Sequence, residues 1–77
     1  MKKYLEDIDR AIKSEKTGKI NIYFGDSTFI DVSKFQIKND DVVTFYNDNI
    51  LTGSIPYGNY TAKPSSPYTS SITLEKE

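Results

Sequence analysis

The sequence predicts an α+β fold that is mainly β, with an N-terminal helix followed by a small, curled antiparallel sheet of five to six strands. Three observations lead to this prediction. Apolar residues recur at every second position between Ile20 and Ile55, which is the period of a strand with one buried face. The segment 41–60 contains two β-prone runs around the polar loop Asn47–Asn49, as in a hairpin. Residues 2 to about 16 have the apolar spacing of a helix instead.

The N-terminal helix is predicted to be amphipathic. Leu5, Ile8 and Ile12 follow the i, i+3, i+7 spacing of one helical face, and Gly18 is a suitable C-terminal stop. Because this apolar stripe is narrow, we expect the helix to lie on a sheet or to cap the open end of a barrel. Favourable i,i+4 ion pairs are expected for Glu6 with Arg10 and for Asp9 with Lys13.

Short strands separated by turn residues account for the middle of the chain. Their expected ranges are 19–24, 28–33, 35–37, 41–46, 50–55 and, as an edge, 59–62. Because every link is short, the strands are expected to pair with their sequence neighbours in an antiparallel meander, with a bend near Ser33. Leu51, Gly53 and Ile55 should share one face, and the glycine indicates a bend or bulge. A helix followed by a curled sheet resembles the order of elements in small SH3-like and Sm-like barrels, and this resemblance implies a fold but no function.

The composition of the chain changes after Ala62. Residues 1–62 are expected to form a single small domain. Residues 63–77 are expected to form a Ser/Pro-rich C-terminal tail, because the two prolines in this segment resist regular pairing. The run Ile72–Leu74 could form a last short strand within the tail.

The missing residue types exclude several kinds of chemistry. The chain has no cysteine and no histidine, which rules out disulfides, thiolate nucleophiles, zinc fingers and imidazole catalysis. Aspartate and asparagine gather at the expected turns, but their spacing matches no calcium-binding loop, and the isolated glycines form no phosphate-binding motif. We therefore expect a protein that is not an enzyme and that has no cofactor and no metal site.

Charge and hydropathy narrow the choice of partners and location. Residues 20–62 carry two lysines against five aspartates, and such an acidic surface disfavours nucleic acid. No apolar run is long enough to cross a membrane, and acidic residues stand where a signal peptide needs its apolar stretch. A cytoplasmic location is therefore expected. The frequent Ile, Lys, Asn and Tyr have AT-rich codons, which is typical of a low-GC bacterium or its phages.

Aromatic residues are the predicted points of contact with a partner. Tyrosine supplies a large contact area with a polar end and is enriched in interfaces. The predicted partner-binding residues are Phe29, Tyr46, Tyr57, Tyr60 and Asp48. An alternative for Tyr57 and Tyr60 is that they fold back to cover the mouth of a barrel.

These observations favour a non-catalytic, cytoplasmic protein-binding module. We expect a phage or mobile-element accessory or inhibitor protein that presents an acidic, tyrosine-bearing surface to a host protein. A small core without covalent links also favours self-association. Two alternatives stay open: an oligomeric SH3-like or Sm-like barrel that binds nucleic acid or a small ligand at subunit junctions, and a structural subunit of a larger particle.

Overall fold

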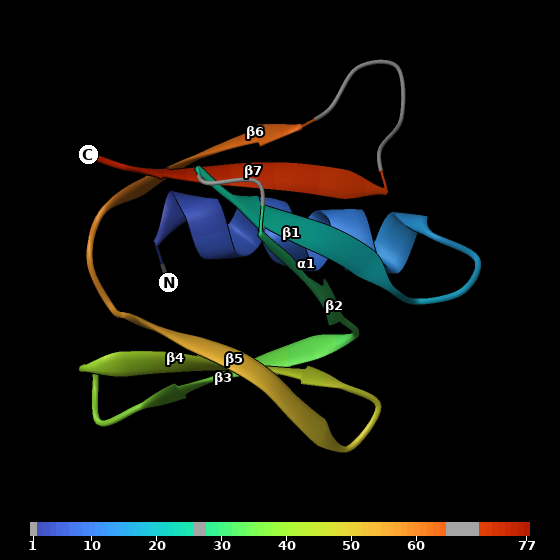
Figure 1. Ribbon diagram of the computed structural model, residues 1–77, viewed down its shortest axis with the longest axis horizontal. Helices are drawn as coiled ribbons and strands as arrows, with labels where there is room; N and C mark the ends of the chain where they lie inside the picture. The colour runs from blue at the N-terminus through green and yellow to red at the C-terminus, as the bar shows by residue number, and fades with distance from the viewer. Residues whose placement is uncertain (1, 26–27, 65–69) are drawn as a thin grey trace.

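The computed structural model describes residues 2–25, 28–64 and 70–77 of the 77-residue chain. Within these residues the fold is α+β and mainly strand, with one N-terminal helix and two sheets (Figure 1). The elements are α1 (Lys3–Ser14), β1 (Ile20–Phe24), β2 (Phe29–Val32), β3 (Lys34–Lys38), β4 (Val42–Asn47), β5 (Ile50–Pro56), β6 (Tyr60–Pro64) and β7 (Ser71–Lys76). The helix and every predicted strand run are therefore confirmed, with small shifts at their ends.

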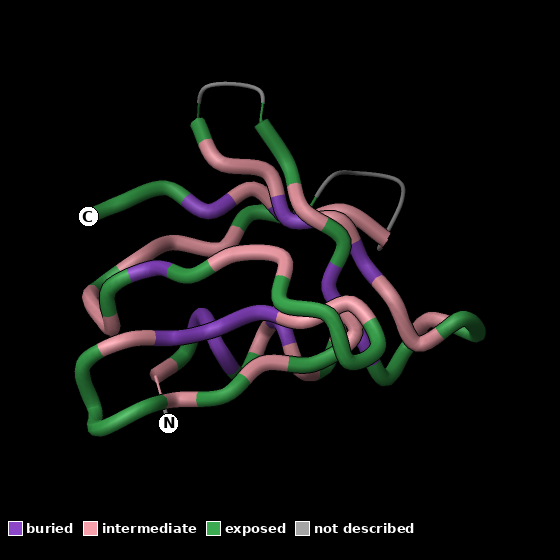
Figure 2. The backbone as a smooth tube through the Cα atoms, turned by 60° about the horizontal axis from the view of Figure 1, so that its bottom comes forward, coloured by how far each residue is buried: buried purple, intermediate pink, exposed green. Residues whose placement is uncertain are grey.

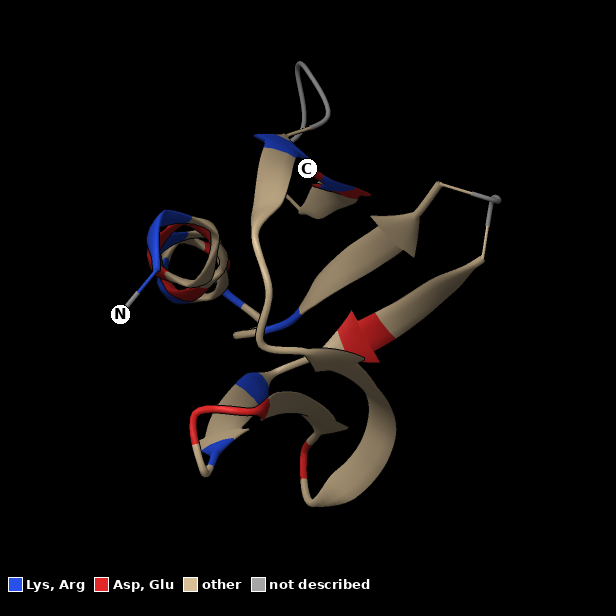
Figure 3. Ribbon diagram, turned by 90° about the vertical axis from the view of Figure 1, so that its left-hand side faces the viewer, with Lys and Arg blue, Asp and Glu red and all other residues tan. Residues whose placement is uncertain are grey.

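The described strands form two sheets rather than the single meander that was expected. The four-stranded sheet has the order β2-β1-β7-β6, and the three-stranded sheet has the order β3-β4-β5. β1 pairs with β7 in parallel, whereas the other neighbours are antiparallel. Figure 3, in which α1 is seen end-on, shows the helix on one side of both sheets. The two sheets do not close into one barrel, so the resemblance to SH3-like and Sm-like barrels is not confirmed.

The meander prediction fails where the chain passes from one sheet to the other. Ser33 lies between β2 and β3, and its N–H donates to the carbonyl of Tyr46 (2.7 Å), which fixes the bend expected there. The last strand, β7, then returns to pair with the first strand, β1. Short links favour pairing between sequence neighbours, but no local pattern indicates a pairing between the two ends of a chain.

β7 occupies the interior of the four-stranded sheet, between β1 and β6. Its residues Ile72 and Leu74 are each 3% exposed and belong to the main core. The last strand expected at Ile72–Leu74 is thus present and longer than expected. The boundary expected after Ala62 falls inside β6.

Buried residues of α1 and of both sheets form one hydrophobic cluster, and Figure 2 shows the buried stretches of the backbone in purple. The predicted helical stripe is confirmed, because Leu5, Ile8 and Ile12 are all buried. The helix ends at Ser14, earlier than predicted, and Gly18 (φ 70°) belongs to the turn that leads into β1. The buried apolar residues of the strands are Ile20, Ile22, Val32, Val43, Phe45, Ile55, Ile72 and Leu74.

The hairpin of β4 and β5 contains a shift in register. Phe45 pairs with Gly53, but the next residue of β4, Tyr46, pairs with Leu51. The extra residue on β5 reverses the alternation of faces beyond it. Leu51 is therefore 59% exposed, and the prediction that it shares a buried face with Ile55 is wrong. The irregularity predicted at Gly53 is confirmed.

Gly53 also allows the second sheet to approach β2 closely. A Cβ atom at this position would lie 3.1 Å from Ile30 Cδ1, closer than side chains normally pack. Beside it, Thr52 Oγ1 donates to the carbonyl of Asp31 (3.0 Å). The two sheets therefore meet at this glycine, where a larger residue would push Ile30 aside.

Three of the predicted turn residues adopt left-handed conformations. The φ angle is 55° at Asn39, 54° at Asp40 and 59° at Asp48, and Asn and Asp tolerate this region better than most residues. Two consecutive positive φ angles are those of a type I′ hairpin turn. Residues 26–27 of the predicted turn and residues 65–69 of the predicted tail lie outside the described residues.

Candidate functional site

A groove runs between α1 and β6. Its larger part has a volume of ≈ 370 Å³, and its smaller part, of ≈ 250 Å³, lies at the N-terminal end of α1. Lys3, Asp7 and Ala62 line both parts, so we treat them as one feature, the helix–strand groove. The other residues that line its larger part are Arg10, Ala11, Ser14, Pro64 and Ile72.

One flank of α1 supplies the first wall of the helix–strand groove. Lys3, Asp7, Arg10 and Ser14 are three or four residues apart, so they form a polar stripe next to the buried stripe. The Ser14 hydroxyl donates to the carbonyl of Arg10 (2.8 Å), and this bond holds the Ser14 side chain against the helix backbone. The same periodicity that buries one face of α1 therefore presents these side chains to the groove.

The sheet supplies the apolar floor. Ala62 and Pro64 point to the same side of β6, and Ile72 of β7 pairs with Pro64. Ala11 adds an apolar surface from the helix. The floor is thus made of small or buried apolar groups, with charged side chains only on its rim.

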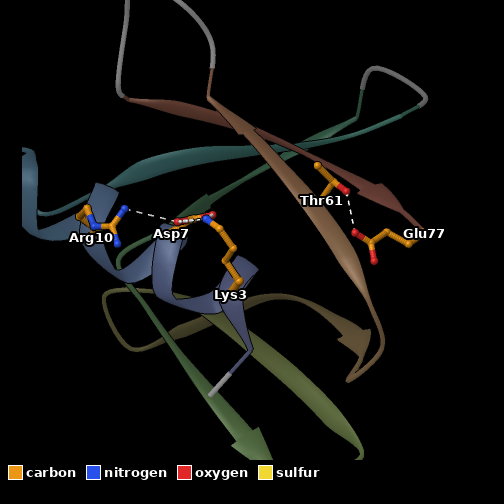
Figure 4. Close-up of polar contacts among 5 residues, drawn as sticks. All are labelled: Lys3, Asp7, Arg10, Thr61 and Glu77. Atoms are coloured by element: carbon orange, nitrogen blue, oxygen red, sulfur yellow. Dashed lines mark hydrogen bonds and ion pairs between the residues drawn. The ribbon is translucent and has the colours of Figure 1, made fainter.

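Asp7 lies between two cations on this rim (Figure 4). Lys3 Nζ is 3.1 Å from Asp7 Oδ2, and Arg10 Nη1 is 3.4 Å from Asp7 Oδ1. The side chains of Lys3 and Arg10 are 84% and 75% exposed, whereas that of Asp7 is 22% exposed. Such exposed ion pairs contribute little to stability, so both cations can also contact a ligand. Among its described lining residues, the larger part of the groove carries one more positive than negative charge.

Tyr4 places a buried hydroxyl at the smaller part of the groove. The residue is 3% exposed, and its ring meets that of Tyr60 edge to face, with 5.1 Å between the centroids. Within the described part of the chain, its Oη atom has no hydrogen-bond partner. Burial, with smaller effects of Tyr60 and Tyr57, raises the pKa of Tyr4 to about 12. The hydroxyl therefore stays protonated and able to donate at neutral pH.

Of the predicted partner-binding residues, the structure brings Tyr57 and Tyr60 together near this hydroxyl. Both are half-buried and pack against the core, so part of their surface serves stability. Tyr60 lines the smaller part of the groove. Lys2 Nζ lies 4.8 Å from the centroid of the Tyr57 ring and also donates to Asn59 Oδ1 (3.0 Å). The surroundings of these tyrosines thus include a lysine.

Tyr46 and Asp48 lie elsewhere, beside the turn between β4 and β5. Lys19 Nζ is 3.1 Å from Asp48 Oδ2, and Lys34 Nζ is 5.7 Å from the centroid of the Tyr46 ring. Thr44 Oγ1 donates to Tyr46 Oη (3.2 Å), and this bond, with the nearby lysine charges, lowers the pKa of the Tyr46 hydroxyl. Neither residue lines the helix–strand groove.

Phe29 lies at a third location, at the start of β2. It is 52% exposed, as its predicted outward position requires, and its ring lies 5.1 Å from that of Tyr23. β2 is the edge of the sheet opposite to β6. Phe29 therefore does not contribute to the helix–strand groove.

Sequence reasoning missed the groove because its residues resemble the ordinary surface of a helix and a strand. The available signal was the i, i+4, i+7, i+11 spacing of polar residues from Lys3, parallel to the apolar stripe. The ion pair predicted for Asp9 with Lys13 is confirmed at 2.9 Å. Arg10 pairs with Asp7 instead of the predicted partner, which places this cation on the groove side of the helix.

Residues 2–25, 28–64 and 70–77 contain no group of three or more Asp or Glu side chains placed to hold a metal ion. The helix in this part of the chain is too short and too polar to cross a membrane.

Comparisons of the chain with protein-family models, with curated proteins and with solved structures found no match. A function for the chain therefore rests on its own geometry.

Proposed function

We propose that the protein is a non-catalytic protein-binding module and that the helix–strand groove is its binding site. The observation that carries this proposal is the combination found there: an apolar floor, exposed cations on the rim, and the buried Tyr4 hydroxyl without a partner in the described chain. Binding sites typically combine apolar walls with a few polar groups of this kind.

The shape of the groove favours a chain over a compact ligand. Its two parts follow one another along α1, from Lys2 at the start of the helix to Ser14 at its end. A helix of 12 residues spans roughly 18 Å. An extended peptide of about five or six residues covers the same distance.

Peptide selection tests this proposal. Random peptides displayed on phage are panned against the immobilised protein, and enriched peptides are then measured by fluorescence anisotropy against Ser14→Trp and Lys13→Trp. Ser14 lines the groove, whereas Lys13 does not and its side chain is 74% exposed. We expect Ser14→Trp to weaken binding about tenfold or more and Lys13→Trp to leave it within about twofold. If no peptide is enriched, or if both variants bind the enriched peptides as the wild type does, the groove is not the binding site.

A further inference from the structure

Among the described strands, β6 lies at the edge of its sheet and is paired on one side, with β7. The Glu77 N–H donates to the carbonyl of Asn59 (3.1 Å). In the same register Thr61 faces Glu75, and bonded pairs alternate with non-bonded pairs along an antiparallel ladder. The backbone N–H and C=O groups of every second residue therefore point toward β7 and bond to it; these residues are Asn59, Thr61 and Lys63. The N–H and C=O groups of the residues between them, Tyr60 and Ala62, point to the free side.

The pairing of β7 with β1 supports the same assignment. The Asn21 N–H donates to the carbonyl of Ser70 (2.8 Å), and Ile22 pairs in parallel with Ile72. The even-numbered residues of β7 therefore bond to β1, which leaves its odd-numbered residues for β6. Pro64 fits this pattern, because a residue without an N–H occupies an edge position whose N–H would have no strand partner.

The free side of β6 faces the helix–strand groove. Ala62 and Pro64 line the groove opposite the polar flank of α1, and no hydrogen bond from another described residue reaches the outward backbone groups of Tyr60 or Ala62. We propose that an extended, acidic segment of a partner protein adds to β6 as a further strand of this sheet, inside the helix–strand groove. This inference rests on the proposed function and names the occupant of that site.

Charge complementarity argues for an acidic segment. Lys3 and Arg10 share the single carboxylate of Asp7, and the contact of Arg10 with it is long, at 3.4 Å. The guanidinium group has five N–H donors in a fork that matches a carboxylate. An Asp or Glu side chain of the bound segment would pair with this cation, while a basic segment would be repelled.

The Tyr4 hydroxyl provides a second, independent indication of a ligand. It is buried beside the smaller part of the groove, and it donates to nothing in the described chain. Strand addition brings peptide carbonyl groups to the edge of a sheet. One such oxygen would accept a hydrogen bond from the hydroxyl and so supply the partner that the described residues do not.

The test uses a peptide enriched by the selection described above. A series of synthetic copies of this peptide, each methylated at one backbone nitrogen, is titrated against the full-length protein. We expect methylation to weaken binding about tenfold at every second residue and little at the residues between them, because only alternate N–H groups reach β6. A set of peptides with uniform sensitivity, or with none, overturns strand addition while the protein-binding function still stands.

The acidic preference has its own readout and control. Panning is repeated with Arg10→Glu and with Lys13→Glu, which make the same charge change on the same helix inside and outside the groove. We expect Arg10→Glu to reverse the enrichment from acidic to basic residues and Lys13→Glu to leave it acidic. Equal enrichment with both variants contradicts the assigned role of Arg10.

If the protein alone forms a dimer at the concentrations of the assay, and Ala62→Pro makes it a monomer, then the occupant is a second copy of this chain and the proposed partner is wrong.

Discussion

The Tyr4 hydroxyl has no hydrogen-bond partner among residues 2–25, 28–64 and 70–77. A buried polar group without a partner costs about 1–3 kcal/mol, and a phenylalanine would make the same apolar contacts with Tyr60. Tyr4 also completes the helical face formed by Leu5 and Ile8, since all three are buried. The hydroxyl therefore fits a role in binding better than a role in folding.

The substitution Tyr4→Phe separates these two roles. We expect it to raise the free energy of unfolding by about 1 kcal/mol, because the unpaired hydroxyl is removed, and to weaken the binding of selected peptides. Urea denaturation measures the first effect and fluorescence anisotropy the second. Tyr23→Phe, at a half-buried position far from the groove, is the control and should change neither. A clear loss of stability in Tyr4→Phe would mean that the hydroxyl already has a partner.

Alkaline pH should destabilise the protein through the same residue. The pKa of Tyr4 is about 12 in the folded protein, against 10.0 ordinarily. The folded state therefore holds this proton more tightly, so the stabilisation is complete below pH 10 and is lost as the pH rises toward 12. The loss is on the order of 2 kcal/mol. The urea midpoint of the wild type should fall between about pH 9 and about pH 11, and that of Tyr4→Phe should fall less. Parallel falls in the two proteins would assign the effect to other groups.

At the scale of elements, the local sequence pattern predicts whether a segment is a helix or a strand. It predicts less well which side chains of that segment face the core. Period-two alternation identified β4 and β5, and turn chemistry identified the left-handed Asp48 between them. One extra residue on β5 nevertheless turned Leu51 outward. A bulge depends on contacts made across the sheets, such as that of Gly53 with Ile30, and these contacts are not visible in a single strand.

The register of β6 gives a test with two adjacent substitutions. Lys63→Pro removes an N–H that bonds to β7 and also the exposed ion pair of Lys63 with Glu75 (2.9 Å), so we expect it to cost about 1–3 kcal/mol. Ala62→Pro removes an N–H on the free side, as Pro64 already does, and should cost about 1 kcal/mol or less. Thermal and urea denaturation compare the two variants. If Ala62→Pro is the more harmful one, the assignment of the outward groups is reversed.

At the scale of the whole molecule, the sequence predicts which elements the fold contains but not how the strands pair into sheets. The helix, the strand runs and the buried stripe follow from local periodicity, whereas the two sheets and the parallel pair of β1 with β7 do not. The groove depends on this pairing, because it lies where β6, held by β7, runs beside α1. The aromatic residues of the sequence were predicted to be the contacts with a partner. The groove is instead formed mainly by residue types that are common on the surface of any helix or strand.

The dependence of the fold on its last strand leads to a prediction. Leu74 is 3% exposed, pairs with Phe24 on one side and Ala62 on the other, and belongs to the core. Leu74→Ala should therefore cost about 2–5 kcal/mol, which is a large part of the stability of so small a domain. Leu51→Ala makes the same chemical change at a residue that is 59% exposed, and should cost within about 0.5 kcal/mol.

Urea denaturation followed by circular dichroism compares these two variants with the wild type. In Leu74→Ala the loss of order should extend to β6 and to the helix–strand groove, because β7 is the strand that joins β6 to the rest of its sheet. Peptide binding should then weaken even though Leu74 does not line the groove. Equal stability of the two variants would show that residues 71–76 behave in solution as part of a tail and that the sheet ends at β1.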